Sequence, residues 1–229
     1  EHEAKVVASL RSPHTIQLYD FGVTDDGALY YAMELLDGMD LDRLVTMHGP
    51  IPPERVVHFM VQACHSLVEA HEVGLVHRDI KPANIFATRN GRDVDVIKVL
   101  DFGLATKPVA ERIPDARVTH EGTIIGTPAY MAPEQVLGDA TIDGRADLYT
   151  LGLVAWFLLT GRDVFQATSA TQVMFAHVHV EPEAPSLHAK MPIPPELEAV
   201  ILKCLAKKRE DRPATAEVLA NALRAIPFA

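Results

Sequence analysis

The polar residues between His77 and Asn84 have the types and spacing that phosphoryl chemistry requires. The segment reads HRDIKPAN and carries a carboxylate at Asp79, an ammonium at Lys81 and an amide at Asn84. A carboxylate can accept a proton from a hydroxyl group, a lysine can neutralise a transferring phosphoryl group, and an amide oxygen can bind a divalent cation. Because such spacing also occurs by chance, a loop of solvated polar side chains is the alternative interpretation.

Two further motifs follow this segment. Asp101-Phe102-Gly103 comes directly after a predicted strand, where a carboxylate can reach a metal ion and a glycine permits a sharp turn. Residues 126–134 read GTPAYMAPE and end a stretch without periodicity, residues 105–128, of a length that is usually functional inside a compact domain. Each motif alone is weak evidence, whereas their order, with a hairpin and then a long loop between them, is specific.

Regular elements are predicted on both sides of the HRDIKPAN segment. Helical periodicity, proline and glycine stops and Asp-Gly or Asn-Gly turns define their approximate ends. The pattern predicts an opening helix that ends at Ser12-Pro13, strands over 16–21 and 29–33, a break at Asp37-Gly38, a helix from Pro52-Pro53 to about Val73, a hairpin over 84–100, and helices over 147–160, 195–207 and 215–226. Thr215 is the expected N-cap of the last helix.

Composition describes an ordinary globular chain of 229 residues, 48% hydrophobic and 23% charged. The formal net charge of −10 argues against nonspecific binding to nucleic acid. The most apolar window, residues 148–160, is shorter than the roughly 20 residues that a membrane span needs, so a buried helix is predicted there. Cys64 and Cys204 are too few and too far apart for a disulfide framework or a zinc site, which favours a reducing, cytoplasmic setting. Two histidine pairs, His65 with His71 and His177 with His179, lack matching cysteines or carboxylates and predict no metal site.

The three motifs together resemble the HRD, DFG and APE signatures of the eukaryotic-like protein kinases. Lys81 two residues after Asp79, together with Thr127, resembles the Ser/Thr branch, and the IKPAN and GTPAYMAPEQ runs are most similar to its bacterial members. The resemblance implies an α+β, two-lobed fold. Residues 1–36 would form a partial small lobe of one helix, two strands and the hinge, and residues 37–229 a mainly helical large lobe.

The resemblance also assigns chemistry to matching positions. It implies Asp79 as the base, Lys81 on the transferring phosphate, and Asn84 and Asp101 as ligands of Mg²⁺, with Mn²⁺ as an alternative. It implies that ATP is the phosphate donor and that Ser and Thr hydroxyls of proteins are the acceptors. The residues expected around the nucleotide are, besides Lys81, Asn84 and Asp101, the gatekeeper Met33, the hinge residues Glu34 and Leu36, and Phe86.

Other matching positions have structural or regulatory roles in the family. Glu3 is similar to the glutamate of the family's C-helix that pairs with a lysine on the third strand. Asp147 is similar to the aspartate that braces the catalytic loop, and Glu134 and Arg212 to a buried ion pair that would leave an unpaired charge if either partner were removed.

The long loop carries the expected switch. Arg78, next to the base, is placed to receive a phosphate from Thr119 or Thr123, which implies autophosphorylation and self-association of two copies. Thr127 is the weaker acceptor, because in the family this threonine contacts the catalytic aspartate and lysine.

The sequence departs from the family pattern at its start. It contains no GxGxxG loop and no lysine suited to the third-strand position, since Lys5 lies on the same predicted helix as Glu3. Glu1 is not a methionine, and the chain begins inside a helical pattern, so we expect a truncated kinase that is feeble or inactive alone. The alternative is a noncatalytic pseudokinase or docking module. The expected location is the cytoplasm, either free or as the cytoplasmic part of a membrane-anchored kinase.

Overall fold

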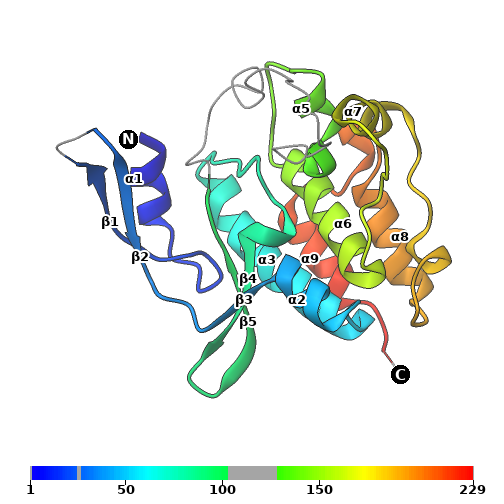
Figure 1. Ribbon diagram of the computed structural model, residues 1–229, viewed down its shortest axis with the longest axis horizontal. Helices are drawn as coiled ribbons and strands as arrows, with labels where there is room; N and C mark the ends of the chain where they lie inside the picture. Colours follow the sequence, from blue (N-terminus) through cyan, green and yellow to red (C-terminus); the bar gives the residue numbers. More distant parts are fainter. Residues whose placement is uncertain (1, 25–26, 103–127, 229) are drawn as a thin grey trace.

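The computed structural model describes residues 2–24, 27–102 and 128–228 (Figure 1). Its helices are α1 (His2–Ser9), α2 (Leu41–His48), α3 (Pro53–Glu72), α5 (Pro133–Val136), α6 (Arg145–Thr160), α7 (Ala170–His179), α8 (Pro195–Cys204) and α9 (Ala216–Arg224). Single 3-10 turns are η1 (Pro82–Asn84), η2 (Pro128–Tyr130), η3 (Pro185–Leu187) and η4 (Arg209–Asp211). The strands are β1 (Leu18–Val23), β2 (Leu29–Met33), β3 (Gly38–Asp40), β4 (Ile85–Asn90) and β5 (Asp93–Val99).

The strands form two small antiparallel sheets. β1 pairs with β2, with Leu18 opposite Met33 at the end of the hairpin that leads into residue 34. β4 and β5 form the predicted second hairpin, and β3 adds to β4 to give the order β3-β4-β5. In Figure 1, α1 and the β1–β2 hairpin stand at one side of the molecule, beside the larger, mainly helical body.

The predicted break at Asp37-Gly38 is wrong, because Gly38 begins β3. Gly38 lies opposite Thr88 of β4, and a Cβ atom at this position would meet the carbonyl oxygen of Ala87 at 2.0 Å. The glycine is therefore required for close approach of two backbones and does not mark a turn.

The helix α2 was not predicted, although its start carries a clear signal. The carboxylate of Asp40 accepts a hydrogen bond from the backbone N–H of Arg43 at 2.8 Å, which is an N-cap interaction. Leu41, Leu44 and Val45 are buried on one face. A helix of eight residues offers only this one short apolar pattern, so it is easily missed.

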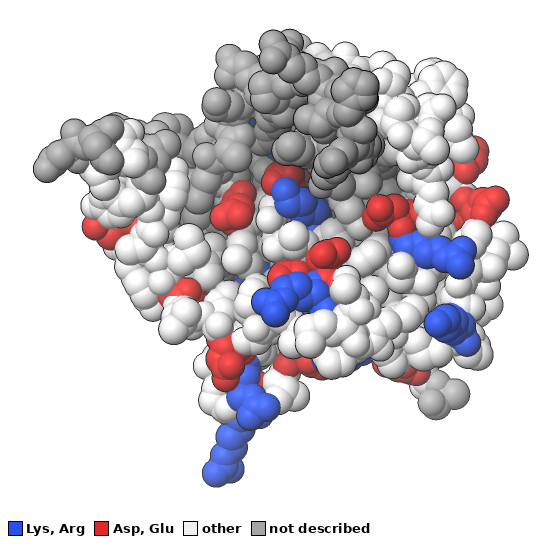
Figure 2. Space-filling model, in the orientation of Figure 1, with Lys and Arg blue, Asp and Glu red and all other residues white. Residues whose placement is uncertain are grey.

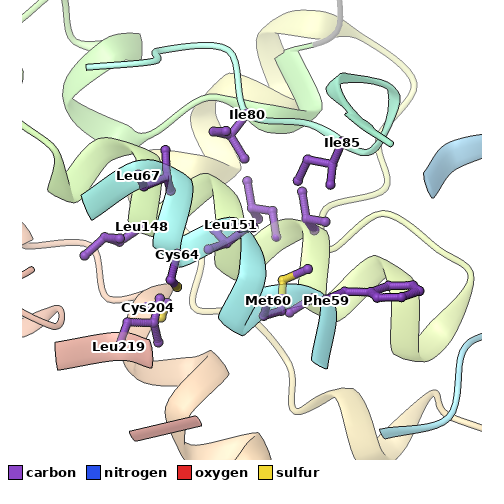
Figure 3. Close-up of a cluster of buried hydrophobic side chains, with 14 of the residues drawn as sticks. Phe59, Met60, Cys64, Leu67, Ile80, Ile85, Leu148, Leu151, Cys204 and Leu219 are labelled. Atoms are coloured by element: carbon purple, nitrogen blue, oxygen red, sulfur yellow. The ribbon is translucent and has the colours of Figure 1, made fainter. Parts of the chain in front are cut away.

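The core of the larger body lies between α3 and α6. Every residue of α6 from Ala146 to Thr160 is buried, which confirms the predicted buried helix. Figure 3 shows how α3 contributes Phe59, Met60, Cys64 and Leu67 to the same cluster, beside Leu148 and Leu151 of α6 and Cys204 of α8. Both cysteines are free thiols, and burial raises the pKa of each, that of Cys204 to about 12. They behave as small apolar side chains.

A short segment before β1 joins the N-terminal elements to the larger body. Val99 of β5 donates its N–H to the carbonyl of His14, and Ile16 donates to the carbonyl of Val99. The carboxylate of Glu69 on α3 accepts the backbone N–H groups of Arg11 and Ser12 at 2.7 and 2.6 Å. Residues 11–16, which we call the junction segment, therefore contact both α3 and β5.

Most predicted helix ends are close to the observed ones. Thr215 caps α9, its hydroxyl accepting the N–H of Val218 at 3.2 Å, which confirms the predicted N-cap. α8 ends at Cys204, three residues before the predicted end, and α5 and α7 were not predicted. Among the described residues, no helix combines the length and hydropathy that crossing a lipid bilayer requires.

Candidate active site

The HRDIKPAN segment forms a loop between α3 and β4, and His77 fixes its inner side. The imidazole is fully buried, its Nε2 lies 2.7 Å from the carbonyl oxygen of Leu100, and its ring packs on Phe102 with centroids 4.6 Å apart. A carbonyl can only accept, so Nε2 carries the proton, and Nδ1 accepts the N–H of Asp79 at 3.2 Å. Burial lowers the pKa of His77, which keeps this neutral tautomer in place.

Asp147 binds the backbone of the same loop with its carboxylate. Its side chain is buried at the start of α6, and its two oxygens accept the backbone N–H groups of His77 and Arg78, each at 2.8 Å. Arg78 adopts φ 65°, a conformation that costs a non-glycine residue about 1–3 kcal/mol. The two hydrogen bonds to a buried carboxylate stabilise this strained backbone.

Asp79, Lys81 and Asn84 meet around one oxygen atom. The Oδ2 atom of Asp79 accepts hydrogen bonds from Lys81 Nζ at 2.9 Å and from Asn84 Nδ2 at 3.0 Å. The side chains of Asp79 and Lys81 are 33% and 30% exposed, so both are accessible from solution. Asn84 Nδ2 also donates to the carbonyl of Asp79 at 2.9 Å, which leaves the Asn84 side-chain oxygen available as an acceptor.

Asp101 lies at the same end of the β4–β5 hairpin as Asn84. The N–H of Leu100 donates to the carbonyl of Asn84 at 2.9 Å, and Asp101 is the next residue. Asp101 is exposed, has φ 60° and makes no hydrogen bond or ion pair with any described residue. Phe102 beside it is fully buried, so the chain turns sharply between a buried ring and an exposed carboxylate.

The side chains of Asn84 and Asp101 offer the oxygen donors that a hard divalent cation prefers. It offers one carboxylate and one amide oxygen, and Mg²⁺ is usually bound by one or two protein oxygens together with phosphate oxygens and water. In the described residues there is no group of three or more His, Cys, Asp or Glu side chains suited to a metal. The two oxygen donors, Asn84 and Asp101, would therefore hold the ion jointly with a phosphate.

The residues predicted around the nucleotide base lie where β2 ends. Met33 is the last residue of β2 and is 37% exposed. The N–H of Glu34 is bonded to the carbonyl of Gln17, and its carboxylate pairs with Lys98 at 2.6 Å. The carbonyl of Glu34 and the N–H of Leu36 form no hydrogen bond with described residues, so this donor–acceptor pair is available to an adenine edge.

Phe86 and Glu3 lie in different regular elements. Phe86 is half-buried in β4, opposite Asp40 of β3. Glu3 lies in α1, and its side chain is outside the described part of the chain. Thr119, Thr123 and Thr127 are also outside the described residues.

Glu134 and Arg212 form a buried bidentate ion pair. Arg212 donates to the two carboxylate oxygens at 2.7 and 2.8 Å, and its other N–H groups bond to the carbonyls of Arg145, Ala206 and Lys207. This pair joins α5 to the turn that precedes α9. Every donor of the guanidinium group that the structure places here is directed at an oxygen, as a buried charge requires.

Sequence reasoning gave no role to two residues that contact the loop. Gln135 Nε2 donates to the carbonyl of Arg78 at 2.8 Å, and His71 Nε2 lies 2.8 Å from Oδ2 of Asp147. The sequence shows His71 only as one member of a histidine pair that predicts no metal site. Its position at the end of α3, six residues before His77, was the available signal, but a contact with α6 cannot be read from one sequence.

A scan against family models matches residues 1–223 to the protein kinase domain. The chain belongs to the protein kinase family. Curated relatives of this kinase domain include the serine/threonine-protein kinase Pkn3 of Myxococcus xanthus, 39% identical over 99% of the chain, and PknB of Mycolicibacterium smegmatis, 40% identical over 97%. The chain spans 41% and 35% of the lengths of these two relatives. The predicted resemblance to bacterial Ser/Thr kinases is confirmed.

Solved structures confirm the predicted α+β kinase fold. The kinase domain of Mycobacterium tuberculosis PknI matches with a TM-score of 0.72 and 29% identity, covering 96% of this chain and 75% of that one. Residues 1–466 of Rad53 in complex with AMP-PNP match with a TM-score of 0.74 and 25% identity, covering 96% of this chain and 53% of that one. Both similarities extend over the small N-terminal elements and the helical body.

Proposed function

We propose that the chain carries the site at which a Ser/Thr protein kinase transfers the γ-phosphoryl group of ATP to protein hydroxyl groups. The observation that carries the proposal is the arrangement of Lys81 and Asn84 around a single oxygen of Asp79. Oδ2 is occupied by these two donors, so Oδ1 is left to accept the proton of a substrate hydroxyl. An accessible carboxylate with one free oxygen next to a lysine is what a positioned base requires.

The other residues bind and orient the two substrates. Lys81 is placed to neutralise charge on the phosphoryl group as it moves from one oxygen to another. The main-chain groups of Glu34 and Leu36 would hold the adenine ring, with Met33 and Phe86 against its faces. Asn84 and Asp101 would hold Mg²⁺, or Mn²⁺ in its place, which when bound reduces the repulsion between phosphate oxygens.

The strongest competing function is noncatalytic. A pseudokinase or docking module would bind a protein without phosphoryl transfer, and the lack of a GxGxxG sequence and of a third-strand lysine in this chain is compatible with it. We favour the enzyme, because binding alone does not require Asp79, Lys81, Asn84 and Asp101 together. We expect low activity from residues 1–229 alone and place the lobe boundary at residue 36.

Regulation by phosphorylation is part of the proposal. The side chain of Arg78 is exposed and makes no hydrogen bond or ion pair with a described residue, so its charge is available for a phosphate on Thr119 or Thr123. Two copies would associate transiently for this step. A cytoplasmic location, free or anchored, follows from ATP as the substrate and agrees with the two free thiols.

The test is phosphate transfer by the full-length protein and two variants. Intact-mass analysis after incubation with ATP, Mg²⁺ and a Ser/Thr peptide should show phosphopeptide with the wild type. Asp79→Asn should lower the rate at least about 100-fold, because a general base contributes about 10²–10⁴. Asp93→Asn, at an exposed position in β5, is the matched control and should retain full activity. No transfer by the wild type with either metal would favour the docking module.

A further inference from the structure

Gln135 of α5 is buried, and its side-chain amide makes one hydrogen bond as a donor and one as an acceptor. Its Nε2 atom donates to the carbonyl oxygen of Arg78 at 2.8 Å, and its Oε1 atom accepts the backbone N–H of Ala132 at 2.9 Å. A carbonyl can only accept and a backbone N–H can only donate, so the two partners fix which end of the amide is which. A buried amide costs free energy unless its oxygen and nitrogen are bonded, as both are here.

The backbone around Gln135 is anchored in the larger body. The preceding residue, Glu134, forms the buried ion pair with Arg212. The N–H of Gln135 donates to the carbonyl of Ala132 at 2.9 Å, and both Ala132 and Pro133 are buried. The amide of Gln135 is therefore attached to a well-fixed element when it reaches the HRDIKPAN segment.

The carbonyl that Gln135 contacts belongs to the peptide group between Arg78 and Asp79. Because a peptide group is planar, the carbonyl of Arg78 and the N–H of Asp79 turn together. Gln135 is bonded to the oxygen end of this group, and Nδ1 of His77 accepts a hydrogen bond from its N–H end at 3.2 Å. Hydrogen bonds at both ends restrict rotation of the group, and its orientation decides how the side chain of Asp79 leaves the backbone.

The strained backbone of Arg78 makes this restraint necessary. Its φ of 65° costs a non-glycine residue about 1–3 kcal/mol, so the surrounding contacts must favour this conformation over ordinary ones. Asp147 accepts the N–H of Arg78 at 2.8 Å, and Gln135 donates to its carbonyl at the same distance. Loss of the second contact would let the backbone relax toward ordinary torsion angles and would turn the peptide group that leads into Asp79.

The other hydrogen bonds of the Asp79 side chain have a different effect. Lys81 and Asn84, which donate to its Oδ2 atom, belong to the HRDIKPAN segment itself. They orient the carboxylate relative to that segment. Gln135 lies 57 residues after Arg78 and joins the segment to a separate element, so its contact determines where the base lies relative to α5.

We propose that Gln135 is a positioning residue for phosphoryl transfer, whose hydrogen bond to the carbonyl of Arg78 fixes the peptide group before Asp79 and thereby places the free oxygen of that carboxylate for the substrate hydroxyl. The inference rests on the proposed kinase function for its effect on the rate, whereas its effect on the peptide group is independent of that function. A displacement of about 1 Å between reacting groups can lower a rate about 100-fold, so a single neutral hydrogen bond at this position has a large effect.

The kinetic test uses the full-length protein with ATP, Mg²⁺ and a Ser/Thr peptide. Gln135→Met has nearly the same size but cannot donate, and should lower kcat at least about 10-fold while both KM values stay within about twofold. In an Asp79→Asn background the same substitution should change the remaining rate less than about twofold, because no base is left to be misplaced. An equal loss in both backgrounds would indicate less folded protein and would overturn the proposal. Gln172→Met, at an exposed position on α7, is the control and should leave the rate unchanged.

A second variant separates the two hydrogen bonds of the amide. Gln135→Glu, assayed at about pH 8.5 so that the carboxyl group is ionised, retains an acceptor for the N–H of Ala132 but has no hydrogen for the carbonyl of Arg78. It should lose at least as much rate as Gln135→Met. A rate equal to that of the wild type would show that only the contact with Ala132 matters, and the proposal would be wrong.

Amide hydrogen exchange, measured by NMR, does not depend on activity. In Gln135→Met the amide of Asp79 should exchange at least about 10-fold faster than in the wild type, the effect of one lost hydrogen bond. The amides of His77 and Arg78 should stay protected, because Asp147 still accepts them. Equal acceleration of all three amides, or of none, would contradict a specific effect on one peptide group. If the wild type transfers no phosphate, the proposed function fails, while this measurement still decides whether Gln135 fixes the peptide group.

Discussion

The chain before residue 41 and the chain after it differ in how much apolar burial and how much hydrogen bonding hold them in place. Among the described residues, Val7 and Ile16 are the buried hydrophobic side chains of residues 2–40, and Val7 packs into the continuous core that residues 41–228 build around α3 and α6. Apart from Val7, with Val6 and Leu10 packed beside it, the N-terminal elements depend on directional polar contacts, chiefly those of Glu69 and Val99 with the junction segment. Burial of apolar surface is the dominant favourable term in folding, so the larger body is expected to supply most of the stability.

This difference shows which part of the site can move. His77, Asp79 and Asn84 are bonded to Asp147, Leu100 and one another within the larger body. Met33, Glu34 and Leu36 lie between the two parts. The hydrogen bonds of Glu69 and Val99 to the junction segment are few and are worth about 0.5–1.5 kcal/mol each, so the N-terminal elements can shift while the HRDIKPAN loop stays fixed.

Surface charges of both signs are mixed on the visible face. On the face shown in Figure 2, Lys and Arg side chains are interspersed with Asp and Glu among the described residues and form no continuous basic surface. Isolated exposed pairs contribute little to stability. The ion pair expected to matter most is the buried one, Glu134 with Arg212.

The largest expected effect comes from breaking that pair. Arg212→Ala leaves a buried carboxylate and three carbonyls without their donor, and should lower the free energy of unfolding by about 3–5 kcal/mol. Urea denaturation measures the loss. Arg55→Ala, which removes the half-exposed pair with Asp95, is the control and should cost no more than about 1 kcal/mol. Comparable losses in the two variants would contradict the comparison.

Lowering the pH should reduce the stability of the larger body, because His177 takes up a proton more readily in the unfolded chain. The pKa of this residue is lowered to about 4 in the fold against 6.5 when unfolded, so between these values the unfolded chain binds more protons. Stability present above pH 6.5 is therefore lost as the pH falls toward 4, by about 3 kcal/mol at most. Urea midpoints at pH 7 and 4.5 should differ less in His177→Gln than in the wild type. Equal differences would show that other groups cause the loss.

A smaller effect is expected where the two parts meet at β3. Gly38→Ala places a methyl group against the backbone oxygen of Ala87, and should cost about 1–3 kcal/mol. Because Gly38 closely follows Glu34 and Leu36, which are proposed to hold the adenine ring, KM for ATP should rise more than KM for peptide. Gly91→Ala, in the open turn of the β4–β5 hairpin, tests the strain of positive φ without a clash. A greater loss in Gly91→Ala would mean that backbone conformation, not close approach, decides the cost at β3.

The smallest effect tests the junction segment directly. Glu69→Gln retains an acceptor but removes the charge, and should lower global stability by about 1 kcal/mol. Hydrogen exchange of the amides of Arg11 and Ser12 should accelerate clearly, while amides of α6 remain protected. Glu72→Gln, exposed on the next turn of α3, should leave all of these amides unchanged. Acceleration spread evenly over α6 would contradict a locally held N-terminal part.

Sequence-based prediction is most accurate where the residue type permits few local conformations or roles. The motif residues, the β4–β5 hairpin and the Thr215 cap follow from local chemistry and were predicted. Gly38 was misread as a break, because a glycine that permits backbone contact looks the same as one that permits a turn. His71, Gln135 and His177 are hydrogen-bonded to partners on other elements, and such contacts depend on packing that one sequence does not encode locally. The predicted roles of the site residues and the lobe boundary stay predictions.

The end of β5 gives the molecule a mechanical property. One edge of Val99 is hydrogen-bonded to His14 and Ile16 in the junction segment, and the following residue, Leu100, is bonded to Asn84 and His77. A pulling force applied to the N-terminal elements would thus pass through two consecutive residues to the position of Asp101. The affinity of Asp101 for a metal ion would then vary with how firmly α1 and the β1–β2 hairpin are attached to the larger body.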